Sequence, residues 1–230
     1  MTRVALLDAK PMAENCYTFG GLDFLSDKFA SVLVERGVSE GEAVAVILEP
    51  SAALAVAALG ALKRNAKVVL LSPSLDLGEI EAALNDGGAK AMVAPFAERE
   101  AYAAIAERHS ITTRFLAGDS SDAIHYEGAE RSFWRDVFLA SSDFTLAMHD
   151  SAPAFVFYAK TAEGALRPLA HTHAAILGQL AQINQQAEQA PDADNALWCG
   201  EDWASPDVLL GSVFPRWWSG GAVMTGPKRR

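Results

Sequence analysis

The sequence predicts an α/β protein built on a mainly parallel sheet that is flanked by helices. Four short strand-like runs, the first of them rich in β-branched residues, alternate with stretches of helical length between residues 21 and 118. Half of the 230 residues are apolar, and a chain of this length can bury about 70% of its unfolded surface. Strand–helix alternation at this spacing is typical of parallel sheets with helices on their faces.

The first half of the chain carries clear helix signals. Residues 21–37 have apolar side chains at helical spacing, and Gly37 is a typical stop residue. Ser51 can cap an alanine-rich helix whose last turn carries Lys63 and Arg64, where cations suit the helix dipole. The other elements predicted in this half are strands at 43–48, 67–73, 89–95 and 112–118, and helices at 77–88, 98–109 and 132–140.

The second half continues the pattern with fewer elements. We predict a strand at 154–160, a long helix at 173–189 capped by Thr172, and short strands at 196–199 and 221–225. The polar stretch at 119–150 separates the two halves. We therefore expect a first βα-repeat subdomain at 1–150 and a second, incomplete α/β subdomain at 151–230.

Charge and cysteine content exclude several classes of protein. With 19 basic and 29 acidic residues the net charge is −10, which argues against a nucleic-acid-binding protein. Cys16 and Cys199 form no disulfide framework or zinc motif, so a reducing cytoplasm is expected. The apolar stretch 43–62 is interrupted by Glu49 and Pro50, which favours a strand, a turn and a buried helix over a membrane span.

The stretch from 155 to 173 carries the most chemical information. It reads as a strand, a loop with Thr161, Gly164 and Arg167, and then a helix N-terminus. Free backbone N–H groups and the helix dipole make such loops suitable for phosphate. An ordinary strand–loop–helix connection remains the alternative at this point.

Three blocks of sequence together resemble the N-terminal part of the adenylate-forming superfamily of AMP-dependent synthetases and ligases, which includes acyl-CoA synthetases. They are residues 17–94, which contain GVSEGEAVAVILEPS, the loop segment that ends in HTHAAILGQL, and residues 196–224, which begin ALWCGEDWASPD. Their order matches the order of motifs in that superfamily. The resemblance implies that Asp202 and Trp203 lie in a turn beside the substrate channel, either as packing residues or as part of the substrate wall.

The loop departs from the phosphate loop of this superfamily, which reads roughly aromatic-T-S-G-T-T-G-x-P-K-G. The aligned stretch here is YAKTAEGALRP, residues 158–168. Most hydroxyls and the early glycine are lost, and Glu163 places a carboxylate where a polyphosphate would lie. If a nucleotide binds, the resemblance implies that these residues face its phosphates: Tyr158, Lys160, Thr161, Gly164 and Arg167.

The resemblance also implies what this chain would do. The superfamily's later motifs, which bind magnesium and ribose and supply a catalytic lysine, would follow residue 230. We therefore expect an acyl-CoA synthetase-like chain that is inactive alone, with no catalytic residue or metal site of its own, and that binds ATP, AMP or an acyl ligand weakly at most. The alternative is a non-catalytic interaction module or one half of a split enzyme. An uncovered sheet edge and Trp217–Trp218 lead us to expect a homodimer or a separately encoded partner.

Overall fold

The structure is a computed structural model that describes residues 3–9, 14–118, 126, 128–146, 149–186 and 195–226. Its strands are β1 (Val4–Ala9), β2 (Glu14–Thr18), β3 (Ala43–Val46), β4 (Lys67–Leu70), β5 (Ala89–Pro95), β6 (Thr113–Ala117), β7 (Glu130–Ser132), β8 (Pro153–Lys160), β9 (Leu166–Thr172), β10 (Leu197–Trp198) and β11 (Val223–Thr225). Its α-helices are α1 (Phe19–Glu35), α2 (Ala52–Lys63), α3 (Leu77–Gly87), α4 (Arg99–Arg108), α5 (Phe133–Leu139), α6 (His173–Gln186), α7 (Pro206–Val208) and α8 (Phe214–Trp218). A 3₁₀ turn, η1 (Phe96–Glu98), precedes α4, and a π turn, η2 (Leu209–Val213), joins α7 to α8.

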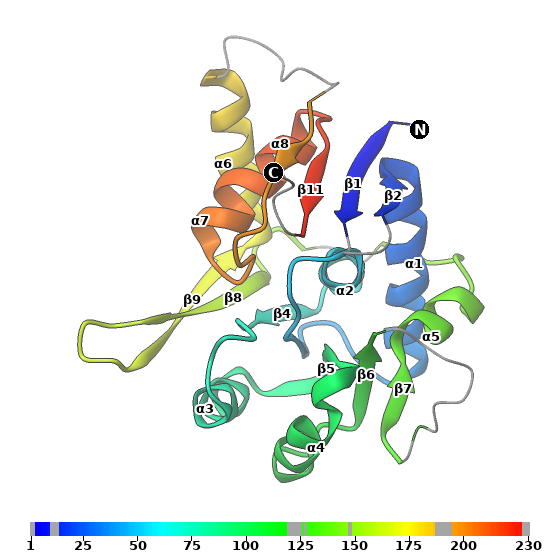
Figure 1. Ribbon diagram of the computed structural model, residues 1–230, viewed down its shortest axis with the longest axis vertical. Coiled ribbons are helices and arrows are strands. Elements are labelled where there is room, and N and C mark those ends of the chain that lie inside the picture. The colour runs from blue at the N-terminus through cyan, green and yellow to red at the C-terminus, as the bar shows by residue number, and fades with distance from the viewer. Residues whose placement is uncertain are drawn as a thin grey trace.

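The elements form two sheets, and the predicted fold class is confirmed. The larger sheet has the order β7-β6-β5-β3-β4-β8-β9, and all its neighbouring strands are parallel except β8 and β9. The smaller sheet has the order β10-β11-β1-β2. Figure 1 shows α2 between the two sheets, with α3 and α4 on the far side of the larger one.

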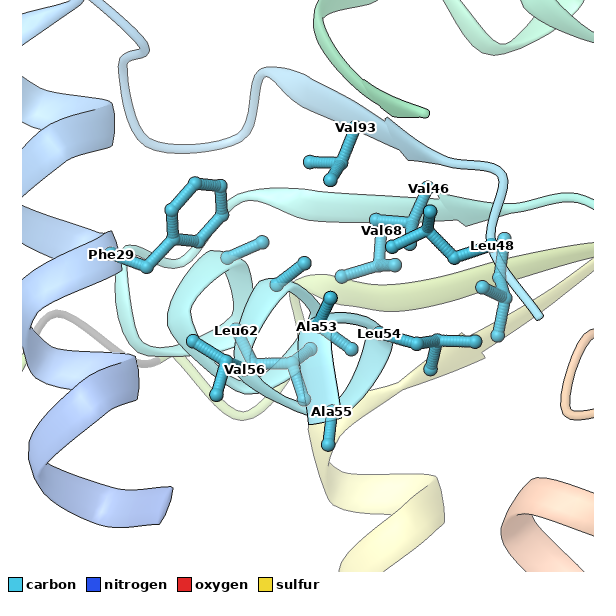
Figure 2. Close-up of a cluster of buried hydrophobic side chains, with 14 of the residues drawn as sticks. Phe29, Val46, Leu48, Ala53, Leu54, Ala55, Val56, Leu62, Val68 and Val93 are labelled. Carbon is cyan, nitrogen blue, oxygen red and sulfur yellow. The ribbon is translucent and has the colours of Figure 1, made fainter. Parts of the chain in front are cut away.

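Helix α2 is the buried helix that the sequence predicted within the apolar stretch 43–62. Ten of its twelve residues are buried, because it packs against α1 and against strands of both sheets. Figure 2 shows Val46, Val68 and Val93 of the larger sheet directed toward it, with Phe29 of α1 beside it. A helix that is apolar all round belongs in a core of this kind. Among the described residues, none of the helices is both long and apolar enough to cross a bilayer.

The predicted helix caps are confirmed. Ser51 Oγ accepts a hydrogen bond from the Leu54 amide, and Thr172 Oγ1 accepts one from the Ala175 amide. Gly37 has a φ of +76° after the end of α1, a conformation that only glycine adopts without strain.

Four strands were not anticipated from the sequence, namely β1, β2, β7 and β9. β7 has only three residues and β2 begins with polar residues, so their patterns are weak, whereas β1 has six residues with the apolar run VALL and could have been predicted. The strand β9 corrects a specific expectation: residues 166–172 pair with β8 as an antiparallel strand, and the predicted loop leading directly into a helix is wrong. The N-terminus of α6 is therefore separated from Gly164 by the whole length of β9.

The two sheets combine strands from both sides of residue 150. β8 joins the larger sheet beside β4, while β1 lies between β2 and β11 in the smaller sheet. The division into subdomains at 1–150 and 151–230 stays a prediction about independent folding, and neither sheet follows it.

Candidate functional site

The stretch predicted to hold phosphate forms the tip of the β8–β9 hairpin, which extends away from the rest of the molecule in Figure 1. The Thr161 amide donates to the Ala165 carbonyl over 2.8 Å, and the Gly164 amide donates to the Thr161 carbonyl over 2.9 Å. Gly164 has a φ of +83°. This is the pattern of a three-residue hairpin loop, in which a type I turn is followed by a left-handed glycine. Gly164 is thus required by the turn itself.

The strand register places the two cations of the hairpin on opposite faces. Lys160 pairs with Leu166, and Arg167 pairs with Ala159. Side chains alternate between faces along a strand, and directly paired residues share a face. The side chains of Lys160 and Arg167 therefore cannot converge on one phosphate group from this hairpin.

Lys160 already has an anionic partner. Its Nζ lies 2.6 Å from Oε1 of Glu79, near the start of α3, and this hydrogen bond raises the pKa of the lysine. The other oxygen of Glu79 accepts from the Asp76 amide in a capping box. The ammonium is consequently neutralised by a carboxylate that the helix cap holds in place.

Tyr158 ties the same face of the hairpin to the same helix. Its hydroxyl lies 2.7 Å from Oδ2 of Asp86 and 3.1 Å from the Ala83 carbonyl oxygen, and it donates to these acceptors. Burial, followed by the hydrogen bond with Asp86, raises the pKa of Tyr158. Tyr158 and Lys160 together fix β8 against α3, so both side chains are engaged in packing the hairpin.

The tip of the hairpin carries a negative charge. Glu163 is exposed, and its proximity to the Thr161 hydroxyl lowers the pKa of its carboxyl group. Oγ1 of Thr161 is buried and has no hydrogen-bond partner of good geometry among the described residues. Arg167 is exposed on β9 and forms no ion pair within the part of the chain that the structure describes.

The hairpin therefore brings only some of the predicted site residues together. Tyr158 and Lys160 meet on α3, Thr161 and Gly164 shape the turn, and Arg167 stands apart. Their role toward a nucleotide stays a prediction.

A second candidate site lies at the carboxyl ends of the parallel strands. The chain leaves β3 toward β4 on one side and returns to β5 on the other, which makes the β3–β5 boundary a topological switch point. Ligands of open α/β sheets bind at such points. A crevice of about 580 Å³ opens here, lined by residues that include Leu48, Pro73, Pro95, Ala117, Trp134 and Tyr17.

The charged side chains that line this crevice, within the part of the chain that the structure describes, are all acidic. They are Asp8, Glu49 and Glu98. Asp8 is buried, where it accepts hydrogen bonds from the Ala52 amide and from the Thr225 hydroxyl. Three carboxylates in one crevice oppose the binding of a polyphosphate. The sequence carries no signal for this site, because its acidic residues come from separate segments and form no motif.

Asp202 and Trp203 lie in a turn, as the resemblance implied. Oδ1 of Asp202 accepts a hydrogen bond from the Ala204 amide over 2.8 Å, which is an Asx turn. Trp203 is fully buried and packs edge-to-face against Trp217 at a ring distance of 5.8 Å. Neither residue lines the switch-point crevice, so a role for them in a substrate wall stays a prediction.

No group of three or more histidine, cysteine, aspartate or glutamate side chains within the described ranges is arranged to hold a metal ion. His171, on β9, instead lies edge-on to Phe157 at a ring distance of 5.7 Å.

The fold, the crevice and the edge hairpin define a class of α/β protein with a largely parallel sheet and an antiparallel strand at one edge. Comparison with known proteins assigns the chain within that class. Residues 1–205 match the family model described as AMP-binding enzyme, and the chain belongs to this family.

Solved structures share the fold. Superposition on ATP-bound MatB from Rhodopseudomonas palustris gives a TM-score of 0.84 at 20% identity, covering 99% of this chain and 43% of that one. An acyl-CoA synthetase from Brucella canis gives 0.83 at 21% identity, covering 99% and 41%. The N-terminal domain of FACL13 from Mycobacterium tuberculosis gives 0.82 at 18% identity, covering 99% and 54%.

Curated relatives match over a shorter stretch. Surfactin synthase subunit 2 of Bacillus subtilis is 34% identical over 77 residues, which is 34% of this chain and 2% of that protein. The PKS-NRPS hybrid synthetase ATPKS of Aspergillus niger is 34% identical over 85 residues, or 37% of this chain and 5% of that protein. The chain thus spans a small part of these relatives and about half or less of the solved structures.

Proposed function

We propose that this chain is an acyl-CoA synthetase-like protein of the AMP-binding family that does not form acyl adenylates by itself. The observation that carries the proposal is the ion pair between Lys160 and Glu79 at 2.6 Å. It occupies the lysine of the hairpin, while Arg167 lies on the other face and Glu163 adds a negative charge at the tip. Formation of an acyl adenylate from ATP needs concentrated positive charge around the polyphosphate. This hairpin does not supply that charge.

Binding of ATP or AMP to the chain is correspondingly weak in this proposal. The described residues of the switch-point crevice add negative charge, because Asp8, Glu49 and Glu98 line it. MatB is ATP-bound in one of the similar structures, so ATP with magnesium is the ligand to test first.

The test is ATP–pyrophosphate exchange by the isolated chain with a panel of carboxylic acids, together with the thermal shift caused by ATP, AMP and magnesium. We expect no exchange above background and little shift. The variant Glu79→Gln keeps the cap, since glutamine also serves in a capping box, and it frees Lys160. We expect it to bind ATP several-fold more tightly, by an increment of about 1 kcal/mol or less.

The matched control is Glu81→Gln, which removes a carboxylate of the same helix that is bound to Arg108. It leaves Lys160 paired and should leave ATP binding unchanged. Robust exchange by the unmodified chain would refute the proposal. Arg167→Ala gives a further check, because a clear ATP shift that this variant abolishes would place the phosphates on the β9 face instead.

An interaction module or half of a split enzyme is the second candidate. It is favoured by large apolar side chains at the surface, among them Trp218, Phe138 and Leu139, which are 51%, 62% and 76% exposed. A polypeptide carrying the later motifs of the family should restore pyrophosphate exchange when mixed with this chain. If exchange stays at background and no complex forms in light scattering, the split-enzyme alternative fails.

A further inference from the structure

A separate cleft of about 620 Å³ lies between α1, α2, α6 and α8, away from the hairpin and the crevice. Its lining residues are Phe19, Gly20, Leu22, Asp23, Ser26, Leu59, Lys63, Leu180, Phe214, Trp217 and Trp218. Volumes of this size and mostly apolar walls are typical of small-molecule sites. The helices that form the cleft come from both halves of the sequence, so no local sequence motif predicts it.

One part of the cleft wall is aromatic. Phe214 and Trp217 are stacked at a ring distance of 5.9 Å, and Trp218 beside them is half exposed. The indole N–H of Trp217 already donates to the Ala5 carbonyl. Rings arranged in this way offer their faces to an apolar or aromatic body, and they attract a cation through their quadrupoles.

The polar part of the cleft contains one lysine whose donors are all used. Nζ of Lys63 lies 2.9 Å from the carbonyl oxygen of Asp23, 2.6 Å from its Oδ1, and 2.6 Å from Oδ1 of Asp27. An ammonium group has three donors, so none remains for a ligand. The hydroxyl of Ser26 likewise donates to the Asp23 carbonyl.

The cluster of Lys63, Asp23 and Asp27 can therefore still accept hydrogen bonds from a ligand, but its lysine has no donor left for one. Two carboxylates face one ammonium, and the Asp23 side chain is 71% exposed. Arg3, whose guanidinium lies close to Gly220, is not among the lining residues. A ligand with a carboxylate head would meet the excess negative charge here, with the neutral indole N–H of Trp218 as its side-chain donor.

We propose that this cleft binds a small aromatic amine, with the ring against Phe214, Trp217 and Trp218 and the ammonium group near Asp23. The site is independent of the first proposed function, because it shares no residue with the β8–β9 hairpin or with the switch-point crevice. The charge preference is opposite to that of a site built for carboxylic acids, which makes the head group of the ligand the property to test.

Three probes with a common phenylbutyl body separate the contributions: phenylbutylamine, phenylbutanol and phenylbutyrate. Isothermal titration of the full chain at pH 7 measures each. We expect the amine to bind about fivefold more tightly than the alcohol, the effect of one exposed charge pair, and the carboxylate to bind most weakly.

Two variants test which side chains contribute to the affinity of the amine. Asp23→Asn should bring the amine to the affinity of the alcohol and leave the alcohol unchanged. Trp218→Ala should weaken both. The matched controls are Glu40→Gln, which removes an exposed carboxylate paired with Arg64, and Leu139→Ala, which removes an exposed apolar side chain on α5; neither should change any of the three affinities.

Several outcomes would overturn the proposal. They are phenylbutyrate binding as tightly as the amine, no binding of any probe at millimolar concentration, or no effect of Asp23→Asn on the amine. Self-association of the unliganded chain in sedimentation, abolished by Trp218→Ala, would show instead that a second copy covers the cleft. Pyrophosphate exchange plays no part in these measurements, so failure here leaves the proposed function standing.

Discussion

Replacing Gly60 with alanine tests the packing of α1 on α2 most directly. A Cβ atom at this position would lie 2.8 Å from the Ser26 carbonyl oxygen and 2.9 Å from Cδ1 of Phe29. Both distances are shorter than van der Waals contact, and the carbonyl belongs to the backbone of α1, so the two helices must move apart. Phe29 is fully buried, which leaves little room for its ring to yield.

The magnitude follows from two opposing terms. Alanine in place of glycine inside a helix gains about 1 kcal/mol. Overpacking a well-packed core costs about 1–3 kcal/mol, and contact with backbone favours the upper part of that range. We therefore expect Gly60→Ala to lower the free energy of unfolding by about 1–2 kcal/mol, or the melting temperature by about 2–6 °C.

Gly178 provides the matched control. It lies inside α6, is exposed, and has no atom within 4 Å of the position its Cβ would take. Gly178→Ala should therefore raise the free energy of unfolding by about 0.5–1 kcal/mol. Urea unfolding followed by circular dichroism measures both variants. If Gly60→Ala stabilises the protein as Gly178→Ala does, the close packing of α1 on α2 is not as described.

Three further predictions concern single side chains. Hydrogen bonding to Arg108, aided by His109, lowers the pKa of Glu81 to about 2; because a lowered native pKa stabilises the fold above the unfolded value, this contribution should be lost as the pH falls from about 4.5 toward 2, and NMR titration of Arg108→Leu should show the pKa of Glu81 returning upward. Cys16 is exposed, whereas Cys199 is buried and burial raises the pKa of its thiol, so Ellman's reagent should modify one thiol rapidly in the native protein and the second only on unfolding; two equally fast thiols would contradict this. Pro168→Thr should increase self-association in light scattering, because it restores a donor on the free edge of β9; an unchanged molar mass across a concentration series would count against that role of the proline.

The sequence predicted the parallel part of the fold well because its signals are local. β5 was predicted with the boundaries that it has, and α3 was predicted to within one residue because a double glycine ends it. The strand β11 was predicted within 221–225, but its pairing with β1 could not be anticipated, because the two strands lie at opposite ends of the chain and meet only through tertiary contacts.

The candidate site was predicted less well, for a reason that concerns β9. The sequence of β9, LRPLAHT, contains a proline and does not alternate regularly between apolar and polar residues, so it gives only a weak strand signal. The role of Lys160 could not be foreseen either, because its partner Glu79 lies 81 positions earlier in the chain. The charge of the switch-point crevice likewise depends on Asp8, Glu49 and Glu98, which only folding brings together.

The residues in which this hairpin differs from a phosphate loop all stabilise it as an edge of the larger sheet. The turn hydrogen bond between Thr161 and Ala165 implies that hydrogen-bonded pairs continue at Ala159 and Arg167. Pro168, one residue further on, then has its nitrogen directed to the free edge, the place in a sheet where proline is tolerated. It removes a donor that another strand could use. The residues that depart from the phosphate-loop pattern thus supply an ion pair to α3, a closed turn and a protected edge, so the hairpin is stabilised by contacts within the chain itself.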